Sequence, residues 1–294
     1  MNEERISRWR EALLLPGETD LLQSSLRDLA DYFGISQAEA ERACESALGD
    51  SKREWEAAAR RTPEQVIDFY DRTRSYIFEH VWWHVVSAEQ NAANVEILDC
   101  AQRCGAREYL DFGSGVGANA ILFARSGLKV TLADVSQTML DFARWRIERR
   151  GLRAEYIYLR QAKLPRQRFD FVTAVDVFEH LVDPGKELWR IGAALKPGGM
   201  IIFNDCTGQD RERPMHILPA ADPIYLGLRR SGFRPAGAEA DPVRHLGFHA
   251  FKRNGQKELS NLVWGLYNGL RYSPVAERGW SLLKGVLARR AEAP

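Results

Sequence analysis

The chain has 294 residues, of which 45% are hydrophobic and 28% are charged, an ordinary composition for a globular protein with a sizeable core. Its 41 Lys and Arg residues nearly balance its 40 Asp and Glu residues, so the net charge favours neither nucleic acid nor an anionic membrane as a partner. The sequence shows neither a signal peptide nor a long apolar run, so we expect a cytoplasmic protein.

The N-terminal part of the chain, residues 1 to about 107, is expected to be helical. One helix spans roughly residues 5–15, and a second begins at Thr19 or Asp20 and ends near Phe33. The segment 62–65 (TPEQ) combines an N-cap, a proline at the first helical position and a capping-box glutamine. Because apolar residues follow it at helical spacing, we predict one long helix from Thr62 to about Val86.

Beyond Ala106, short strand-like runs alternate with helical segments. The expected strands are 108–112, 129–134, 154–159, 169–175, 199–205, 233–239 and 246–253. Helices are expected up to Ser126 and over 136–150, 184–195 and 220–231. This alternation predicts an α/β fold with a mostly parallel sheet. Two further amphipathic helices are expected beyond Lys257.

The turn after the first strand carries three glycines at alternate positions, Gly113, Gly115 and Gly117. Glycines there allow a tight backbone path and let a ligand approach the main chain. Asp134 ends the second strand, where a carboxylate can accept both hydroxyls of a ribose. Alone, such a loop would also suit a dinucleotide or a phosphate.

The stretch from Asp111 to Gly117, DFGSGVG, resembles motif I of the class I S-adenosylmethionine-dependent methyltransferases. Residues 133–136 are similar to the second motif of that family, 169–184 to its fourth, and 195–205 to the turn into its fifth strand. The resemblance covers roughly residues 90–253. It implies a Rossmann-like sheet of seven strands with the last strand antiparallel, and a methyltransferase of the small-molecule type.

The resemblance also implies roles for individual residues around the cofactor. The glycine loop lies against the methionine part of S-adenosylmethionine, with Asp111 near the ammonium, Asp134 on the ribose hydroxyls and Val135 on the adenine. An Asp-Ala pair usually meets the adenine edge, and Gln161-Ala162 stands in its place here. The implied cofactor-binding residues are Asp111, Gly113, Ser114, Gly115, Gly117, Asp134, Val135, Gln161, Ala162 and Asp176.

The cleft beside the cofactor is expected to hold the groups that act on the acceptor. Glu179 and His180 follow the fourth strand, where a general base or a metal-binding acid would stand, and His84 is a further catalytic candidate. The end of the helix 62–86 combines aromatic and histidine side chains, so we expect it to close over the cleft. The expected substrate-binding residues are Tyr70, Tyr76, His80, Trp83, Cys206 and His216.

Three regions are therefore expected: a helical cap or lid at 1–87, a Rossmann-like methyltransferase domain at 88–256, and a C-terminal amphipathic helical extension at 257–294. The expected reaction moves a methyl group to oxygen or nitrogen of a small molecule, and the expected acceptor is a biosynthetic intermediate. The extension is expected to pack on the body of the protein or on a second copy in a homodimer. Membrane contact through its basic, amphipathic helices is the alternative.

Other functions remain open at this stage. A protein of this fold that binds the cofactor without catalysis and a nicotinamide-dependent oxidoreductase both fit parts of the pattern. Residues 29–36 resemble the turn of a DNA-binding helix-turn-helix, although the surrounding segment 18–50 is acidic. No metal site is expected, because the four cysteines lack paired spacing and His80 and His84 lack a third ligand.

Overall fold

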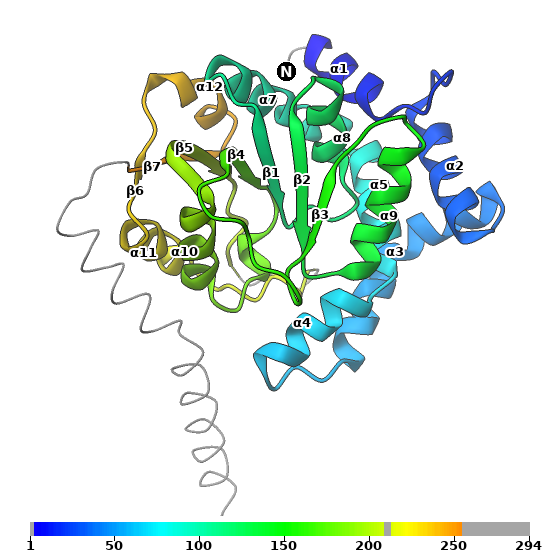
Figure 1. The fold of residues 1–294 in the computed structure, drawn as a ribbon. Coiled ribbons are helices and arrows are strands. Elements are labelled where there is room, and N and C mark those ends of the chain that lie inside the picture. The colour runs from blue at the N-terminus through cyan, green and yellow to red at the C-terminus, as the bar shows by residue number, and fades with distance from the viewer. Residues whose placement is uncertain (1–2, 209–212, 255–294) are drawn as a thin grey trace, which may run out of the picture.

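The computed structural model describes residues 3–208 and 213–254, and a seven-stranded sheet lies at its centre (Figure 1). The strands lie in the order β3-β2-β1-β4-β5-β7-β6. Strands β1 to β5 are parallel, and β7 runs antiparallel to its neighbours β5 and β6. The bounds are β1 (Glu108–Phe112), β2 (Lys129–Asp134), β3 (Glu155–Tyr158), β4 (Phe169–Ala174), β5 (Leu195–Phe203), β6 (Phe233–Pro235) and β7 (His249–Arg253). The expected fold class is confirmed.

The helices precede, connect and flank these strands. Those before the sheet are α1 (Glu3–Leu13), α2 (Leu21–Phe33), α3 (Gln37–Ala57), α4 (Pro63–Arg72), α5 (Ser75–Val86), α6 (Ala88–Asn91) and α7 (Ala93–Arg103). Those between the strands are α8 (Ala118–Arg125), α9 (Gln137–Glu148), η1 (Phe178–His180), α10 (Pro184–Ala194), α11 (Asp222–Arg230), η2 (Ala238–Ala240) and α12 (Asp241–Arg244).

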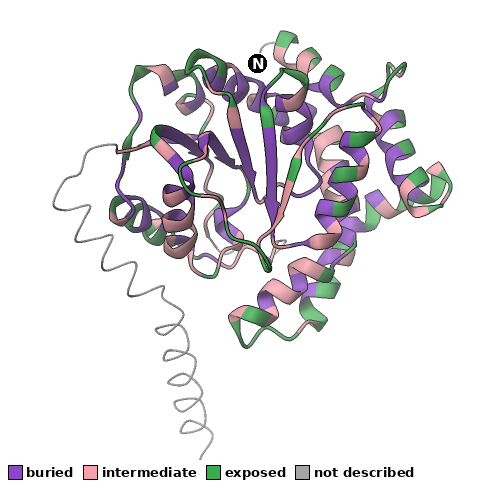
Figure 2. Ribbon diagram, viewed as in Figure 1, coloured by how far each residue is buried: buried purple, intermediate pink, exposed green. Residues whose placement is uncertain are grey.

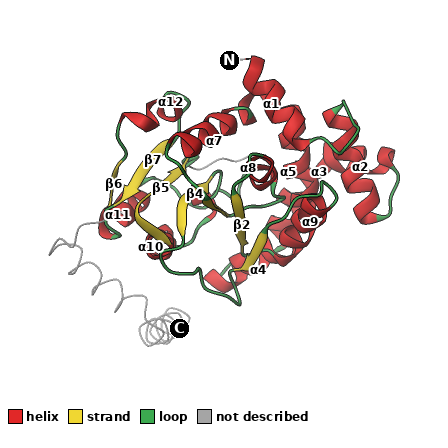
Figure 3. Ribbon diagram, turned by 45° about the horizontal axis from the view of Figure 1, so that its top comes forward, coloured by secondary structure: helices red, strands yellow, loops and turns green. Residues whose placement is uncertain are grey.

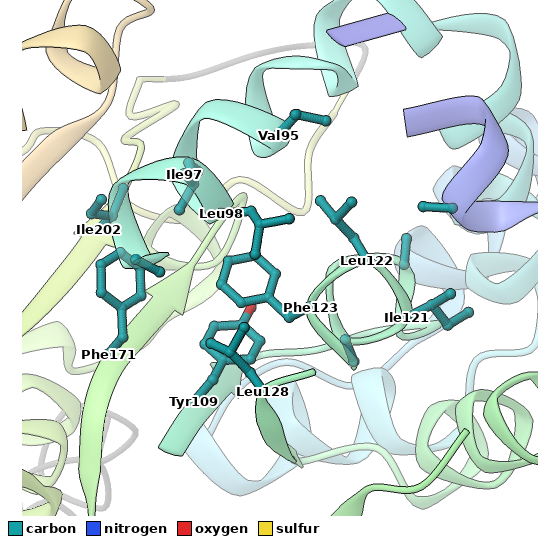
Figure 4. Close-up of a cluster of buried hydrophobic side chains, with 14 of the residues drawn as sticks. Val95, Ile97, Leu98, Tyr109, Ile121, Leu122, Phe123, Leu128, Phe171 and Ile202 are labelled. Atoms are coloured by element: carbon teal, nitrogen blue, oxygen red, sulfur yellow. The ribbon is translucent and has the colours of Figure 1, made fainter. Parts of the chain in front are cut away.

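Alternating side chains of the strands supply two hydrophobic layers, one on each face of the sheet. On one face Tyr109 and Phe171 pack beneath α7 and α8, and the rings of Tyr109 and Phe123 stack with centroids 3.8 Å apart (Figure 4). On the other face Leu110 and Val172 pack against α10 and α11. Figure 3 shows these two pairs of helices on opposite sides of the sheet, and Figure 2 shows that the central strands are buried. The carboxyl ends of the parallel strands are thereby held in fixed positions.

The N-terminal helices contribute to one core of the sheet and also form a third cluster with the glycine turn and α9. Trp9 of α1 is completely buried in the cluster that contains Ile121 of α8. Leu29 of α2 belongs to a third cluster, together with Val116 of the glycine turn and Phe142 of α9. Because this third cluster includes the glycine turn, the packing of the N-terminal helices bears directly on the cofactor side of the molecule.

The long helix predicted from Thr62 to Val86 is in fact two helices, α4 and α5. Thr73 is extended (φ −65°, ψ 127°) and interrupts the helix. Its hydroxyl donates a hydrogen bond to a carboxylate oxygen of Glu54 in α3, and the Ser75 hydroxyl donates to the same oxygen at 3.0 Å. Hydroxyl side chains that find partners outside the helix compete with helical geometry. The break redirects α5 along α3 and across the glycine turn.

Two sequence predictions concern the membrane and the C-terminal extension. Within residues 3–208 and 213–254, no helix combines the length and the apolar character that a membrane crossing requires. The predicted amphipathic helices at 257–294 lie outside the described residues.

Candidate active site

The glycine turn between β1 and α8 requires glycine at each of its three alternate positions. Gly113, Gly115 and Gly117 have φ values of +70°, +49° and +76°, in the left-handed region that side chains disfavour. A Cβ atom on Gly113 would lie 2.5 Å from the side chain of Val177, and one on Gly115 would lie 2.9 Å from Nδ1 of His80. The turn is therefore closely packed between the end of β4 and helix α5.

Asp134, at the end of β2, holds the glycine turn through its carboxylate. The Gly115 amide donates to Oδ2 and the Ser136 amide donates to Oδ1, each at 2.9 Å. Burial raises the pKa of Asp134, and these backbone hydrogen bonds oppose the rise. Each carboxylate oxygen has a second lone pair, so Asp134 can still accept hydrogen bonds from two hydroxyls of a ligand.

Three buried polar atoms beside the turn have no hydrogen-bond partner among the described residues. They are Oδ2 of Asp111, Oγ of Ser114 and Oδ1 of Asn119. Buried polar atoms are rarely left unpaired, so the three atoms indicate a polar ligand at this position. The amino-acid part of S-adenosylmethionine carries an ammonium and a carboxylate, and these atoms fit it. Burial raises the pKa of Asp111 to about 7, against the hydrogen bond from Thr173.

The predicted adenine-binding residues lie at the ends of β2 and β3. Gln161 and Ala162 are exposed in the turn after β3, and both of their amides donate to the carbonyl of Tyr158, at 3.0 and 2.9 Å. The Tyr158 hydroxyl donates to Asp71 of α4 at 2.7 Å, and the Gln137 amide at the start of α9 donates to the same carboxylate at 2.9 Å. Helix α4 therefore joins both loops that flank the adenine position, beside the ends of β2 and β3 (Figure 1).

Glu179 and His180 lie in the 3-10 helix η1, directly after β4. Glu179 is completely buried, and neither of its carboxylate oxygens has a hydrogen-bond partner in the described part of the chain. Burial raises its pKa to about 8, with a further contribution from the charge of Asp176. Burial lowers the pKa of His180 to about 3, so its imidazole is neutral at physiological pH.

Backbone and tyrosine groups fix the ring of His180. Its Nδ1 lies 3.1 Å from the carbonyl of Met215 and 3.2 Å from the Tyr70 hydroxyl. The Tyr70 hydroxyl also donates to the Met215 carbonyl at 2.9 Å. A carbonyl can only accept, so this arrangement favours the tautomer with its proton on Nδ1 and a free lone pair on Nε2.

Asp176 and Cys206 meet at the ends of β4 and β5. Asp176 is exposed and has a φ of +54°, which is uncommon for a residue with a side chain. The Asp176 amide donates to Oδ1 of Asn204 at 2.7 Å, and the Asn204 amide group donates back to Asp176 at 2.5 Å. The Cys206 thiol lies 3.7 Å from the same carboxylate. The strained backbone therefore keeps one carboxylate at the mouth of the cleft.

Helices α4 and α5 present a continuous series of rings to the cleft. Successive centroids lie 4.9–6.4 Å apart along His84, His80, Tyr76, Tyr70, His180 and His216. The structure thus brings Tyr70 and His216 next to His180, while three rings separate His84 from it. Trp83 lies beside this series, with the Arg213 guanidinium 5.3 Å from its ring. The catalytic role of His84 and the substrate-binding roles stay predictions.

Two sets of side chains in the cleft have the chemistry and the spacing to hold a metal ion. Glu179, His180 and His216 offer ligand atoms that lie within 4.8 Å of one another, as do Asp176, Glu179 and Cys206. Oxygen and imidazole ligands suit several divalent cations. The sequence placed Glu179 and His180 where a metal-binding acid would stand, but it did not show the complete sets, because Cys206 and His216 come from separate segments.

A groove of the described surface lies between the α3–α4 connection and the loop at 214–217. Its volume is about 1040 Å³. Its apolar walls include Trp55, Val66, Val182, Pro214 and Ile217, and Arg60 and Arg61 lie at its edge. The Ile217 amide donates to the carbonyl of Glu179 at 2.8 Å, so the groove borders the backbone of the cleft.

Several residues of the site were missed at the sequence level. Asn119 is the second residue of α8 and closely follows the glycine turn, so its place in the motif was an available signal. Asp71 and Asn204 had no such signal. Each acquires its position from a partner on another segment, Gln137 for Asp71 and Asp176 for Asn204.

Part of the chain is similar to known methyltransferases. Residues 90–223 match the family described as "Methyltransferase domain". The ubiquinone biosynthesis O-methyltransferase of Coxiella burnetii (strain RSA 493 / Nine Mile phase I) is 26% identical over 223 residues, covering 68% of this chain and 94% of that protein. The protein of the same name from Bradyrhizobium diazoefficiens is 36% identical over 112 residues, 38% of this chain and 43% of that protein. A solved S-adenosylmethionine-dependent methyltransferase from Clostridium acetobutylicum is 16% identical with a TM-score of 0.47, covering 60% of this chain and 98% of that one.

Proposed function

Because the chain is a class I S-adenosylmethionine-dependent methyltransferase, we propose that it methylates a hydroxyl oxygen of a small-molecule acceptor. The observation that carries the proposal is the buried carboxylate of Glu179, whose oxygens have no hydrogen-bond partner among residues 3–208 and 213–254 and which lies beside two histidines. The names of the O-methyltransferase relatives support transfer to oxygen rather than to nitrogen.

The chemistry of the acceptor decides what the protein has to provide. When bound, S-adenosylmethionine supplies a methyl group that is already activated by its sulfonium. An amine acceptor needs only to arrive neutral, whereas a hydroxyl acceptor generally has to lose a proton to a base in the cleft. A cleft that gathers Glu179, His180 and His216 suits the hydroxyl acceptor.

We assign Glu179 as the group that takes this proton. A carboxylate with a pKa near 8 is a stronger base than an exposed glutamate, and its pKa lies close to the working pH. Its two unpaired oxygens leave it free to bond to an acceptor hydroxyl. The neutral His180, with its lone pair on Nε2, orients the acceptor by accepting a hydrogen bond from a second polar group.

The rings of α4 and α5 complete the wall of the acceptor site. Tyr70 and Tyr76 are almost fully enclosed, and burial raises the pKa of both hydroxyls, so both remain neutral donors. The Tyr76 hydroxyl has no partner in the described residues and is available to an acceptor. Cys206 and His216 close the wall from the side of β5. This wall excludes water and holds the acceptor in line for transfer.

The test uses the purified full-length protein and S-adenosylmethionine with a deuterated methyl group. It is incubated with pooled hydroxyl-bearing and pooled amine-bearing small molecules, and mass spectrometry with fragmentation locates the label. We expect label on oxygen, and we expect Glu179→Gln to lower turnover at least about a hundredfold, since general-base contributions are of that size. Glu79→Gln is the matched control, because Glu79 is a half-buried carboxylate of α5 that bonds to Ser51.

Two results would overturn the proposal. Label on nitrogen would refute the assignment of the acceptor, and undiminished turnover in Glu179→Gln would refute the role of Glu179. A third arm adds a chelator to the wild type. Loss of turnover that a divalent cation restores would assign Glu179 and His180 to a metal ion instead of a proton.

A further inference from the structure

A buried cluster of charges connects helix α2 to helix α9. The carboxylate of Asp28 accepts from Nε of Arg146 at 3.1 Å and from Nη2 of Arg150 at 2.7 Å. Nη1 of Arg149 lies 3.4 Å from the same carboxylate. The side chains of Asp28, Arg146 and Arg150 are at most 1% exposed. Removing such charges from water costs free energy, and a buried ion pair therefore stabilises a fold only weakly. Stability alone does not explain why these charged residues are buried here.

Arg146 makes a second contact, and this contact reaches the cofactor side of the molecule. Its Nη1 donates to the carbonyl of Val116 at 3.0 Å. Val116 lies between two glycines of the turn and is completely buried. In the same peptide unit, the Gly117 amide donates to the carbonyl of Ser114 at 2.9 Å. Both polar groups of this peptide are therefore fixed, and the orientation of the peptide is set by Arg146.

The orientation of Arg146 depends in turn on the N-terminal helices. Asp28 holds the guanidinium from the side of α2, and burial lowers the pKa of Arg146 to about 10, so it stays cationic at neutral pH. Arg150 extends the cluster to the end of α1, because its Nη2 donates to the carbonyl of Leu13 at 2.6 Å. A continuous series of hydrogen bonds thus runs from α1 and α2 through α9 to the glycine turn.

We propose that Asp28 and Arg146 are positioning residues, which fix the Val116–Gly117 peptide in the conformation that binds S-adenosylmethionine. Without Asp28 the Arg146 guanidinium loses its fixed direction, and the buried Val116 carbonyl loses its partner. The left-handed glycines on either side then let the turn relax, since their backbone has no side chain to restrain it. Helices α1 and α2 thereby control the affinity for the cofactor through Arg146.

The chain offers a matched control for this proposal. Glu96 of α7 is a carboxylate with a side chain 5% exposed, and it pairs with Arg5 of α1 and, at 2.8 Å, with Arg103. This ion pair also ties an N-terminal helix to the body of the protein, but neither arginine bonds to the glycine turn. Removing its charge therefore measures the loss of stability alone.

The experiment compares full-length wild type, Asp28→Asn and Glu96→Gln by calorimetric titration with S-adenosylhomocysteine and by thermal unfolding. We expect both variants to unfold at lower temperature. Asp28→Asn should weaken binding at least about tenfold, while Glu96→Gln stays within about twofold of the wild type. With an acceptor in hand, Asp28→Asn should raise KM for S-adenosylmethionine and leave kcat at saturation nearly unchanged.

Arg146→Lys keeps the test decisive if Asp28→Asn does not fold. Lysine keeps a positive charge beside Asp28. Its single ammonium, however, lacks the separate Nε and Nη1 donors with which the guanidinium bonds to Asp28 and to the Val116 carbonyl. We expect this variant to weaken S-adenosylhomocysteine binding about fivefold or more. Wild-type affinity in the folded variants overturns the proposal, and so does an equal loss in Glu96→Gln. Because wild-type binding is measured first, failure of the cofactor assignment itself would be seen separately.

Discussion

We expect the carboxyl group of Asp111 to make cofactor binding dependent on pH. Asp111 is 3% exposed, its Oδ1 accepts from the Thr173 hydroxyl at 3.1 Å, and its Oδ2 has no partner in the described residues. With a pKa of about 7, it is largely protonated below neutral pH in the ligand-free protein. The ammonium expected beside it favours the charged carboxylate, so binding should release a proton.

The magnitude follows from the fraction of Asp111 that is ionised. A pKa near 7 leaves about 3% of the carboxyl ionised at pH 5.5 and about half at pH 7.0. Affinity for S-adenosylhomocysteine should therefore rise about fifteenfold over this interval, or about 1.6 kcal/mol. His80 and His180 do not contribute, because burial lowers their pKa values to about 4 and about 3.

The assay is calorimetric titration with S-adenosylhomocysteine at pH 5.5, 6.25 and 7.0, in buffers of different ionisation enthalpy. The dependence of the heat on the buffer gives the number of protons released, which should fall from nearly one at pH 5.5 to about one half at pH 7.0. Asp111→Asn removes the titrating group and should abolish both the proton release and the pH dependence. If the affinity of Asp111→Asn changed with pH as steeply as that of the wild type, the reasoning would be refuted.

The same carboxyl should affect the stability of the ligand-free protein. Its pKa is raised above the ordinary value of 3.8, so the folded state binds the proton more tightly than the unfolded chain does. The contribution of Asp111 is then fully present below about pH 4 and is lost as the pH rises through 7. Thermal unfolding of the wild type should accordingly lose more stability than that of Asp111→Asn between pH 4 and pH 7.

Two further variants test the cofactor side of the site. Asp134→Ala should weaken S-adenosylhomocysteine binding by about 1.5–3 kcal/mol, the size of charged hydrogen bonds, while circular dichroism shows an intact fold; unchanged calorimetric affinity would contradict the assignment. Gly115→Ala should destabilise the protein by about 1–2 kcal/mol through its left-handed backbone and also abolish binding, because the new methyl group meets His80. Gly127→Ala is its control, since Gly127 is also left-handed but has open space around it, and normal binding in Gly115→Ala would refute the role of the turn.

The prediction of the cofactor side of the site rests on local signals. The glycines at 113–117 follow β1 directly, and Asp134 is the last residue of β2. Since the carboxyl ends of neighbouring parallel strands lie at the same edge of a sheet, these residues meet in any fold of this class. The strands were also predicted from local signals. A short apolar run between turn residues indicates a strand that is buried on both faces of a sheet.

Helix continuity was harder to predict, as the break between α4 and α5 shows. Residues 62–86 have one start signal and an unbroken apolar spacing, which indicate a single helix. The break depends on Glu54 of α3, whose carboxylate accepts from the hydroxyls of both Thr73 and Ser75. Because Glu54 lies about twenty residues away in the sequence, the spacing of apolar residues over 62–86 does not reveal this contact.

The sequence by itself indicated the alternation of strands and helices, the resemblance to a family and the residues expected to face the cofactor, because each of these depends on neighbours along the chain. Only the tertiary structure decided that Glu179 meets His216 and that Asp28 holds Arg146, 118 residues away. In the sequence, Asp28 and Arg146 fit a solvent-exposed helix face as well as a buried cluster. Their roles arise from burial, because the loss of water makes their pairing obligatory, and burial is decided only when distant segments pack together.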